Sequence, residues 1–313
     1  MGIKEIKAGF KSGEINKGDF INQMHGFHKV LFDFSENLKH SEIAKIEISD
    51  DNVLFTTRST DYHPGGCKFY VDVIDKRVTP VDTFNFDVYE KQDSEMLFKL
   101  LQDGDTIFDI GANIGWYSCH MAKKLPMAKI YSFEPIPETF EKLNKNITIN
   151  DITNVVLNNI AFSSKRETLT FYYSPLVTGA SSSQNITENE HMSKLECAAD
   201  TLDNYMAVNN IEKLDFIKCD VEGAEYFVFQ GGSKTFVEHK PIVFTEMLRK
   251  WAAKFGYSPN DIITYFTNFG YKCFVSDAGK LRQFGTVTDE TQETNYFFLH
   301  DIKHQEIISA HSN

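Results

Sequence analysis

The sequence predicts an α/β fold in which a doubly wound, mostly parallel sheet carries helices on both faces. The main observation is that, from Val88 onward, short apolar runs alternate with segments of helical periodicity. A second observation is that several runs end in glycine or acidic residues, at the strand ends where such sheets bind ligands. The expected strands are 106–110, 129–133, 155–161, 215–219 and 242–245, with a terminal pair at 271–276 and 296–300 and short extra strands at 169–173 and 195–198.

Residues 1–87 lack this alternation and are predicted to form a small α+β appendage to a main domain of residues 88–313. Near-helical spacing of apolar residues predicts one or two helices over 15–38, and two short runs predict strands at 53–57 and 68–74. The appendage could cover a substrate site, mediate formation of a homo-oligomer, or pack against the sheet edge. The sequence leaves these three roles open.

The composition of the chain limits the kinds of partner and the cellular compartment that we expect for the protein. The chain has 44 acidic and 32 basic residues and a formal net charge of −12, which disfavours broad contact with a nucleic-acid backbone. Its five cysteines show no metal-binding spacing and are expected to be reduced thiols, which favours the cytoplasm. No apolar segment is long enough to span a bilayer, and the N-terminus lacks the apolar core of a signal peptide.

The segment TIFDIGANIGWYS (106–118) reads as a buried strand, a glycine-bearing loop and the start of a helix. Gly111 and Gly115 permit close approach of a ligand to the backbone at the positive end of that helix. Glu134 follows the next predicted strand, 23 residues after Gly111, where a carboxylate can accept hydrogen bonds from the two hydroxyls of a ribose. These features predict a nucleoside site.

The chemistry of this loop favours a nucleoside without phosphates. Dinucleotide loops usually place a glycine where this chain has Asn113, and this loop is one residue shorter. Asp109 adds a carboxylate before the first glycine, which suits a ligand with an ammonium group. S-adenosylmethionine has an amino-acid end, a ribose and an adenine, so it fits the pattern D-x-G-x-N-x-G better than a nicotinamide or flavin dinucleotide does.

Carboxylates at two later strand ends are candidates for the chemistry. Asp220 follows the run 216–219, and Glu246 follows the run 242–245. Transfer of a methyl group to an alcohol requires removal of the hydroxyl proton, by a carboxylate or imidazole within hydrogen-bond reach. Asp220 and Glu246 could share a substrate hydroxyl, or could bind Mg²⁺, which would lower the pKa of that hydroxyl. His63 and His191 are weaker candidates for the base.

Four blocks of this sequence resemble the FkbM-type methyltransferases, a family of Rossmann-like S-adenosylmethionine-dependent enzymes. They are FDIGANIGWYS (108–118), YSFEPIP (131–137), TLDNYM (201–206) and DFIKCDVEGAEYFVFQGG (215–232). GASSS (179–183) is similar to the serine-bearing loop of the family, and PIVFTEM (241–247) to its next strand. The likeness covers roughly residues 90–275, and the pairing of TLD with DVEGAE makes it specific.

The resemblance implies O-methylation of a hydroxyl on a sugar, glycan or other small metabolite. It places Asp109, Gly111, Ala112, Asn113 and Gly115 around the methionine part of the donor, Glu134 at the ribose, and Ala161 and Phe162 near the adenine. It also places Asp220, Glu222 and Glu225 in the family's D-x-E-G-x-E motif. Ser181 and Ser182 could bind the donor carboxylate or form a turn. Glu225 could equally serve only the dipole of the helix that it begins. The expected catalytic residues are Asp220, Glu222 and Glu246, and the expected donor contacts include Ser182.

Two other functions stay open at this point. One is a non-catalytic protein that binds the methyl donor and uses its N-terminal region as a scaffold surface. The other is an N-methyltransferase or a nucleic-acid methyltransferase, which is disfavoured because CDVE (219–222) stands where amino-group methylases carry an N-P-P-Y block. The acceptor is expected to be recognised by the appendage and by the polar loop 178–189.

Overall fold

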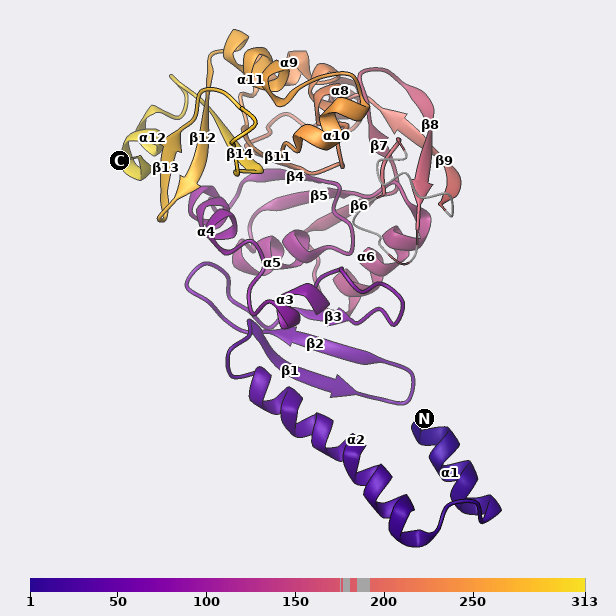
Figure 1. The fold of residues 1–313 in the computed structure, drawn as a ribbon. Coiled ribbons are helices and arrows are strands. Elements are labelled where there is room, and N and C mark those ends of the chain that lie inside the picture. Colours follow the sequence, from indigo (N-terminus) through magenta and orange to yellow (C-terminus); the bar gives the residue numbers. More distant parts are fainter. Residues whose placement is uncertain (175, 177–180, 185–191, 313) are drawn as a thin grey trace.

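The computed structural model describes residues 1–174, 176, 181–184 and 192–312. Its centre is an eight-stranded sheet with the strand order β13-β12-β14-β11-β10-β4-β5-β6 (Figure 1). The strands of this sheet are β4 (Thr106–Ile110), β5 (Lys129–Phe133), β6 (Val155–Asn158), β10 (Phe216–Cys219), β11 (Ile242–Glu246), β12 (Tyr271–Asp277), β13 (Lys280–Gln283) and β14 (Asn295–His300).

The sheet is mixed, because only its β6, β5, β4, β10 and β11 half is parallel throughout. β14 pairs antiparallel with both β11 and β12, and β13 pairs antiparallel with β12. The predicted α/β class is confirmed, and the expected terminal pair is extended by β13, which the sequence analysis did not anticipate. β10 lies between β4 and β11, in a register that places Lys218 beside Asp109 and Phe244.

The expected single strand over 155–161 is wrong, because the chain leaves the central sheet after β6. The side chain of Asn158 accepts a hydrogen bond from the Tyr205 hydroxyl, and Asn159 donates to the carbonyls of Glu134 and Pro135. Such side-chain bonds compete with the strand ladder. The following residues form β7 (Ala161–Phe162), which joins a separate three-stranded sheet with β8 (Glu167–Tyr173) and β9 (Ser193–Asp200).

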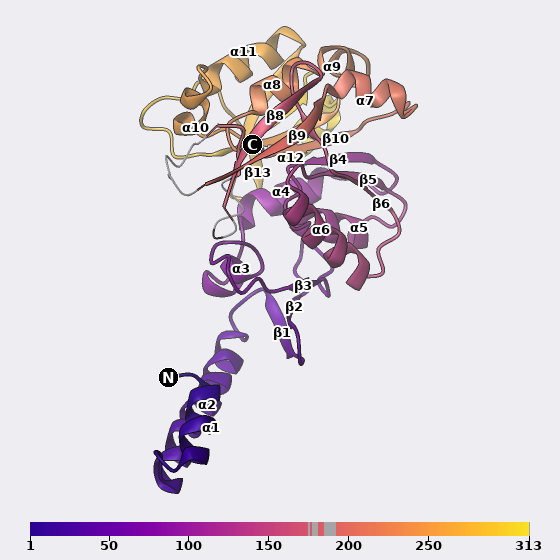
Figure 2. The same cartoon turned by 90° about the vertical axis from the view of Figure 1, so that its right-hand side faces the viewer.

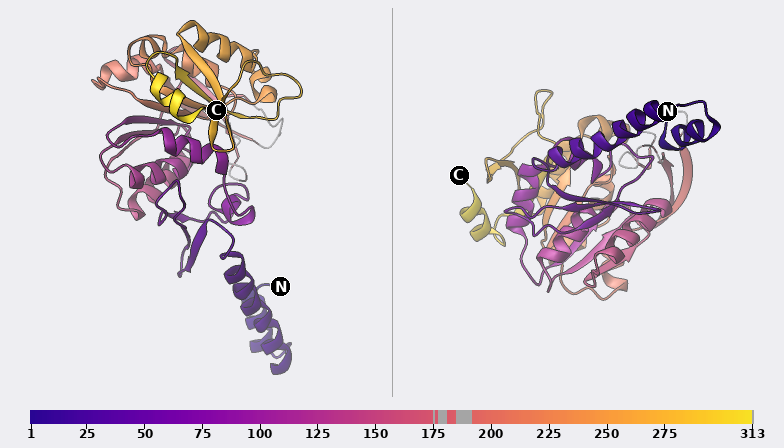
Figure 3. Two further views of the ribbon diagram at one scale, coloured as in Figure 1. Left: turned by 90° about the vertical axis from the view of Figure 1, so that its left-hand side faces the viewer. Right: turned by 90° about the horizontal axis from the view of Figure 1, so that it is seen from below.

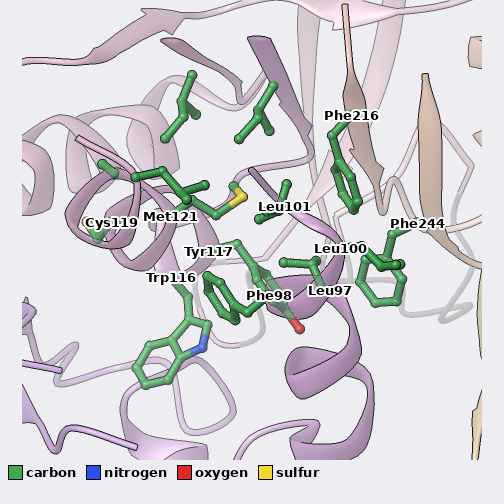
Figure 4. Close-up of a cluster of buried hydrophobic side chains, with 14 of the residues drawn as sticks. Leu97, Phe98, Leu100, Leu101, Trp116, Tyr117, Cys119, Met121, Phe216 and Phe244 are labelled. Carbon is green, nitrogen blue, oxygen red and sulfur yellow. The ribbon is translucent and has the colours of Figure 1, made fainter. Parts of the chain in front are cut away.

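Alternate residues of the central strands face two hydrophobic cores. Ile107 and Phe216 contribute to one core, and Phe108 and Ile217 to the other. Figure 4 shows part of the first core, where helix side chains such as Leu97 and Met121 pack near Phe216. The helices that contribute to the first core are α4 (Lys91–Leu100), α5 (Trp116–Lys124) and α6 (Pro137–Ile149); those of the second are α7 (Leu202–Val208), α8 (Glu225–Gln230), α9 (Ser233–Glu238) and α11 (Pro259–Asn268). Two shorter helices are α10 (Arg249–Lys254) and α12 (Gln305–His311).

The N-terminal region consists of a helical arm and a small antiparallel sheet. The arm is formed by α1 (Ile3–Ser12) and α2 (Lys17–Asn37), and it projects away from the body (Figures 1 and 2, and the left view of Figure 3). α2 was predicted, α1 was not, and no residue of α2 is buried. The remaining elements are β1 (Ile43–Ile48), β2 (Val53–Thr57), β3 (Lys68–Tyr70) and α3 (Val81–Asn85).

The small sheet packs directly on the main domain. The Phe69 ring stacks on Trp116 with centroids 5.0 Å apart, and the Asn146 side chain accepts a hydrogen bond from the backbone N–H of Tyr70 at 3.1 Å. The strand predicted over 68–74 ends at Tyr70, because the Asp72 carboxylate accepts the N–H groups of residues 74 and 75 and forms a turn. Throughout the described ranges, no helix is both long and apolar enough to cross a membrane.

Candidate active site

A cavity of about 410 Å³ opens at the carboxyl ends of the parallel strands, the usual ligand position in such sheets. Its volume lies within the range of small-molecule sites. Strand-end loops of β4, β5, β10 and β11 line one side, and residues from the N-terminal region line another. The lining includes residues 77–79 with 82, 110–114, 133–136, 160–162, 220–222 with 224, and 246 with 248, 250 and 251.

The loop after β4 fits closely against its neighbours. The N–H groups of Gly111 and Ala112 both donate to the Phe133 carbonyl, at 3.0 and 2.9 Å. Gly111 has φ +75°, and a Cβ built on it would lie 1.8 Å from the Asp220 carbonyl oxygen. Only glycine meets both conditions. The predicted residues Gly111, Ala112 and Asn113 all line the cavity.

Glu134 joins this loop to the end of β5. One carboxylate oxygen accepts the Asn113 N–H at 3.1 Å, and the other accepts the Ile136 N–H at 2.9 Å. Burial raises the pKa of Glu134 to about 7, against the lowering effect of these two N–H groups. Glu134 lines the cavity, so the carboxylate predicted for the ribose lies beside the predicted donor loop.

An apolar slot lies next to Glu134. Ala161 and Phe162, predicted to lie near an adenine, line it together with Ile160, Leu169 and Phe171. Phe162 also packs against Phe133, with ring centroids 4.7 Å apart. The residues predicted to lie near an adenine are therefore part of an apolar stretch of the cavity wall.

Three predicted donor contacts lie outside the cavity lining. Asp109 is fully buried: one carboxylate oxygen accepts the Ser118 hydroxyl at 2.5 Å, and the other lies 3.6 Å from the Lys218 ammonium. Gly115 packs against Leu143 at the start of α5. Ser182 is fully buried, and its hydroxyl donates to the Glu222 carbonyl at 2.8 Å, whereas its neighbours Ser181 and Ser183 line the cavity. The structure therefore places Asp109, Gly115 and Ser182 in support of the wall and not on its surface.

The predicted catalytic carboxylates meet at one end of the cavity. Asp220, Glu222 and Glu246 each offer an oxygen atom, and these atoms lie within 4.8 Å of one another. Burial and the neighbouring Asp220 carboxylate raise the pKa of Glu246 to about 10 and raise the pKa of Glu222 well above its ordinary value. One oxygen of Asp220 is buried without a hydrogen-bond partner.

Glu225, the last residue of the D-x-E-G-x-E motif, has a structural role. Its side chain is 1% exposed, and one carboxylate oxygen accepts the N–H groups of Val221 and Gly223 at 3.0 and 3.1 Å. The other accepts the Tyr257 hydroxyl at 3.2 Å. Glu225 thus fixes the turn that carries Asp220 and Glu222.

Of the two histidine candidates, the structure describes only His63, and it does not line the cavity that holds the carboxylate cluster. His63 is buried between the N-terminal region and α5, where its ring lies 4.3 Å from that of His120. His191 and most of the loop 178–189 lie outside the described residues.

Lys218, which is not among the residues predicted from the sequence, lies on the cavity wall among the carboxylates. Its ammonium group donates to the Gly111 carbonyl at 2.9 Å and lies 3.6 Å from both Asp109 and Asp220. Burial lowers the pKa of Lys218, but Asp220, Asp109 and Glu90 outweigh burial and raise it above its usual value. The available signal was a lysine inside the otherwise apolar strand FIKC.

The sheet and the cavity at its parallel strand ends define a Rossmann-like α/β protein. The sequence matches the Methyltransferase FkbM domain over residues 109–273, more than half of the chain. The protein therefore belongs to the FkbM methyltransferase family.

Part of this chain is similar in sequence to other methyltransferases. Methyltransferase sdnD of Sordaria araneosa is 31% identical over 173 residues, which cover 46% of this chain and 66% of that protein. The hexuronic acid methyltransferase AglP of Haloferax volcanii is 28% identical over 136 residues, covering 44% of this chain and 53% of that protein. The chain thus spans between half and two thirds of the length of these relatives. A crystal structure of an FkbM methyltransferase from Methylobacillus flagellatus aligns with TM-score 0.43 and 14% identity, over 64% of this chain and 45% of that chain.

Proposed function

We propose that the protein is an S-adenosylmethionine-dependent O-methyltransferase that acts on a hydroxyl of a sugar, glycan or small metabolite. The observation that carries this proposal is the arrangement of one cavity. Its wall combines the Gly111 loop and Glu134 with the neighbouring carboxylates of Asp220, Glu222 and Glu246. A donor and an acceptor can therefore meet between them.

The residues of the cavity fit the methyl donor. Asn113 Oδ1 and Ser181 Oγ are buried without hydrogen-bond partners, and both residues line the cavity. Such atoms gain from a ligand that supplies polar groups. The donor's ammonium group would satisfy Asn113, its ribose hydroxyls would donate to Glu134, and its adenine would occupy the slot beside Phe162.

The bound donor supplies an electrophilic methyl group on a sulfonium. Asp220 is the residue that would accept the proton of the attacking hydroxyl, because one of its oxygens has no partner and the other faces Lys218. Glu246, whose pKa of about 10 keeps it protonated near neutral pH, would orient the hydroxyl by hydrogen bonds. Glu222, whose pKa is raised by burial and by the Asp220 carboxylate, would contribute a second hydrogen bond. Alignment of acceptor and donor can contribute roughly 7–11 kcal/mol to lowering the barrier.

The same three carboxylates also fit a divalent cation such as Mg²⁺. Hard oxygen ligands at this spacing are the kind that Mg²⁺ binds, and the ion would lower the pKa of an acceptor hydroxyl. Asp220, Glu222 and Glu246 would then be its ligands. Asp220 would then bind the metal ion and would not itself accept the proton. The two roles predict different responses of the activity to a metal chelator.

The N-terminal region is proposed to cover the acceptor side of the cavity. Arg77, Thr79 and Asp82 line the wall there, and Lys250 and Trp251 line the mouth. Lys250 lies over the Trp251 ring, with its ammonium 4.1 Å from the centroid. Cations and an aromatic ring suit a sugar with a carboxylate, and the relative named a hexuronic acid methyltransferase agrees with that class of acceptor. All five cysteines are free and buried, which supports the proposed cytoplasmic location.

Isothermal titration with S-adenosylhomocysteine tests the donor assignment. We expect the wild type to bind, and Glu134→Ala to weaken binding by more than tenfold, since the variant removes the ribose acceptor and the link to Asn113. Glu141→Ala, on the exposed side of α6, is the matched control and should bind as the wild type does. A wild type that binds no S-adenosylhomocysteine contradicts the proposal. Donor binding without turnover of glucuronic acid, neutral hexoses or other hydroxylated acceptors would favour the non-catalytic alternative.

A further inference from the structure

Lys218 is the only buried lysine or arginine in the part of the chain that the structure describes, and it is 4% exposed. Burial of a charged group is costly unless partners compensate it. Its partners come from two different parts of the site. They are the carbonyl of Gly111 in the donor loop, the carboxylate of Asp109 beneath that loop, and the carboxylate of Asp220 at the acceptor end.

The backbone explains why one side chain reaches all three groups. Lys218 pairs with Asp109 in the register of β10 and β4, and Asp220 follows two residues later. The Asp220 N–H donates to the Ile110 carbonyl at 3.1 Å, which draws the ends of the two strands together. The Tyr117 ring, 5.7 Å from the ammonium, closes the space beside it. Without the ammonium group, the carboxylates of Asp109 and Asp220 would face each other with no cation between them.

We propose that Lys218 is a positioning residue that holds the donor loop and the acceptor-side carboxylate in one fixed geometry, through simultaneous contacts with Gly111 and Asp220. This inference rests on the proposed function, because it assigns the Gly111 loop to the methyl donor and the Asp220 carboxylate to the acceptor. It predicts that the charges of Lys218 and Asp220, which lie 3.6 Å apart, act as a unit on a ligand bound in the cavity that both residues line.

The test compares the affinities for S-adenosylmethionine and S-adenosylhomocysteine, which differ by the positive charge of the sulfonium. We expect Lys218→Met to weaken binding of S-adenosylhomocysteine about tenfold, because the Gly111 carbonyl loses its partner. The affinity for S-adenosylmethionine relative to that for S-adenosylhomocysteine should rise about tenfold, as expected for removal of one nearby positive charge. Asp220→Asn should move this ratio the opposite way. The double variant should return the ratio to near the wild-type value.

Lys213→Met is the matched control, because Lys213 is exposed, pairs with Asp215 at 2.9 Å and lies before the same strand. It should leave both affinities unchanged. A purely structural role for Lys218 predicts equal losses for both ligands and independent effects of the two substitutions, and this outcome would overturn the inference. Wild-type affinities in Lys218→Met would overturn it too.

Lys218→Gln, which retains an amide donor, provides a second variant, and thermal unfolding is recorded for each protein. If both Lys218 variants fail to fold, the residue belongs to the core and the inference is wrong. A wild type that binds neither ligand refutes the proposed function together with this inference. Binding by the wild type with unaltered Lys218 variants refutes the inference alone.

Discussion

Substitution of Gly111 by alanine tests the close contact between the donor loop and the end of β10. A left-handed backbone costs a non-glycine residue about 1–2 kcal/mol. The added Cβ would also lie 1.8 Å from the Asp220 oxygen and 2.9 Å from its carbonyl carbon. Because both atoms are backbone, the loop or the turn at Asp220 must move by roughly an ångström, and overpacking of this kind costs about 1–3 kcal/mol. We therefore expect a total loss of about 2–5 kcal/mol in the free energy of unfolding.

Gly104→Ala is the control that isolates the backbone contribution. Gly104 lies just before β4 and has φ +92°, but a Cβ there would meet no atom within 4 Å. We expect it to lose only about 1–2 kcal/mol and to bind S-adenosylhomocysteine normally. Denaturant unfolding and isothermal titration of both variants provide the measurements. Equal stability losses in the two variants, or normal ligand binding by Gly111→Ala, would refute the argument that this contact shapes the site.

Two further predictions concern the carboxylates. Burial raises the pKa of both Glu134 and Glu225 to about 7 from 4.5, so their stabilising contribution is complete below pH 4.5 and is lost as the pH rises through 7. The unfolding temperature should therefore fall between pH 5 and 8, and less steeply in Glu225→Gln, which cannot ionise; an unchanged slope would contradict this. At pH 7.5, Glu246→Gln should keep most of the turnover because it mimics the protonated side chain, whereas Asp220→Asn should lose at least about 100-fold. Large losses in both variants, together with inhibition by EDTA and recovery with Mg²⁺, would instead assign the cluster to a metal ion.

The strands that carry the donor loop could be predicted from local sequence. β4 and β5 have the predicted bounds, since each is an apolar run that ends at a glycine or an acidic residue. The run 155–161 looked equally continuous, yet it is divided between two sheets. At the end of β6, the Asn158 side chain accepts a hydrogen bond from Tyr205, 47 positions away, and a local pattern contains no information about such a partner.

The site shows the same division between local and long-range causes. Gly111, Asn113 and Glu134 could be identified because backbone conformation and ligand chemistry restrict those positions strongly. The burial of Asp109 could not, since it depends on Ser118 in the next helix and on Lys218 in a strand more than 100 residues away. Glu222 and Glu246 are brought together only by the pairing of β10 with β11 and by the turn that Glu225 fixes.

The segment that matches the family domain contributes one part of the cavity lining, and residues before that segment contribute another. The donor loop, Glu134 and the carboxylate cluster all lie within residues 109–273, the segment that matches the family domain. Arg77, Thr79 and Asp82, which also line the cavity, lie before that segment. Under the proposed function, substitutions of these residues should alter the fit of an acceptor without disturbing the Gly111 loop, because the two sets of residues come from separate elements. Selectivity for the acceptor is therefore expected to differ among relatives that retain the same donor chemistry.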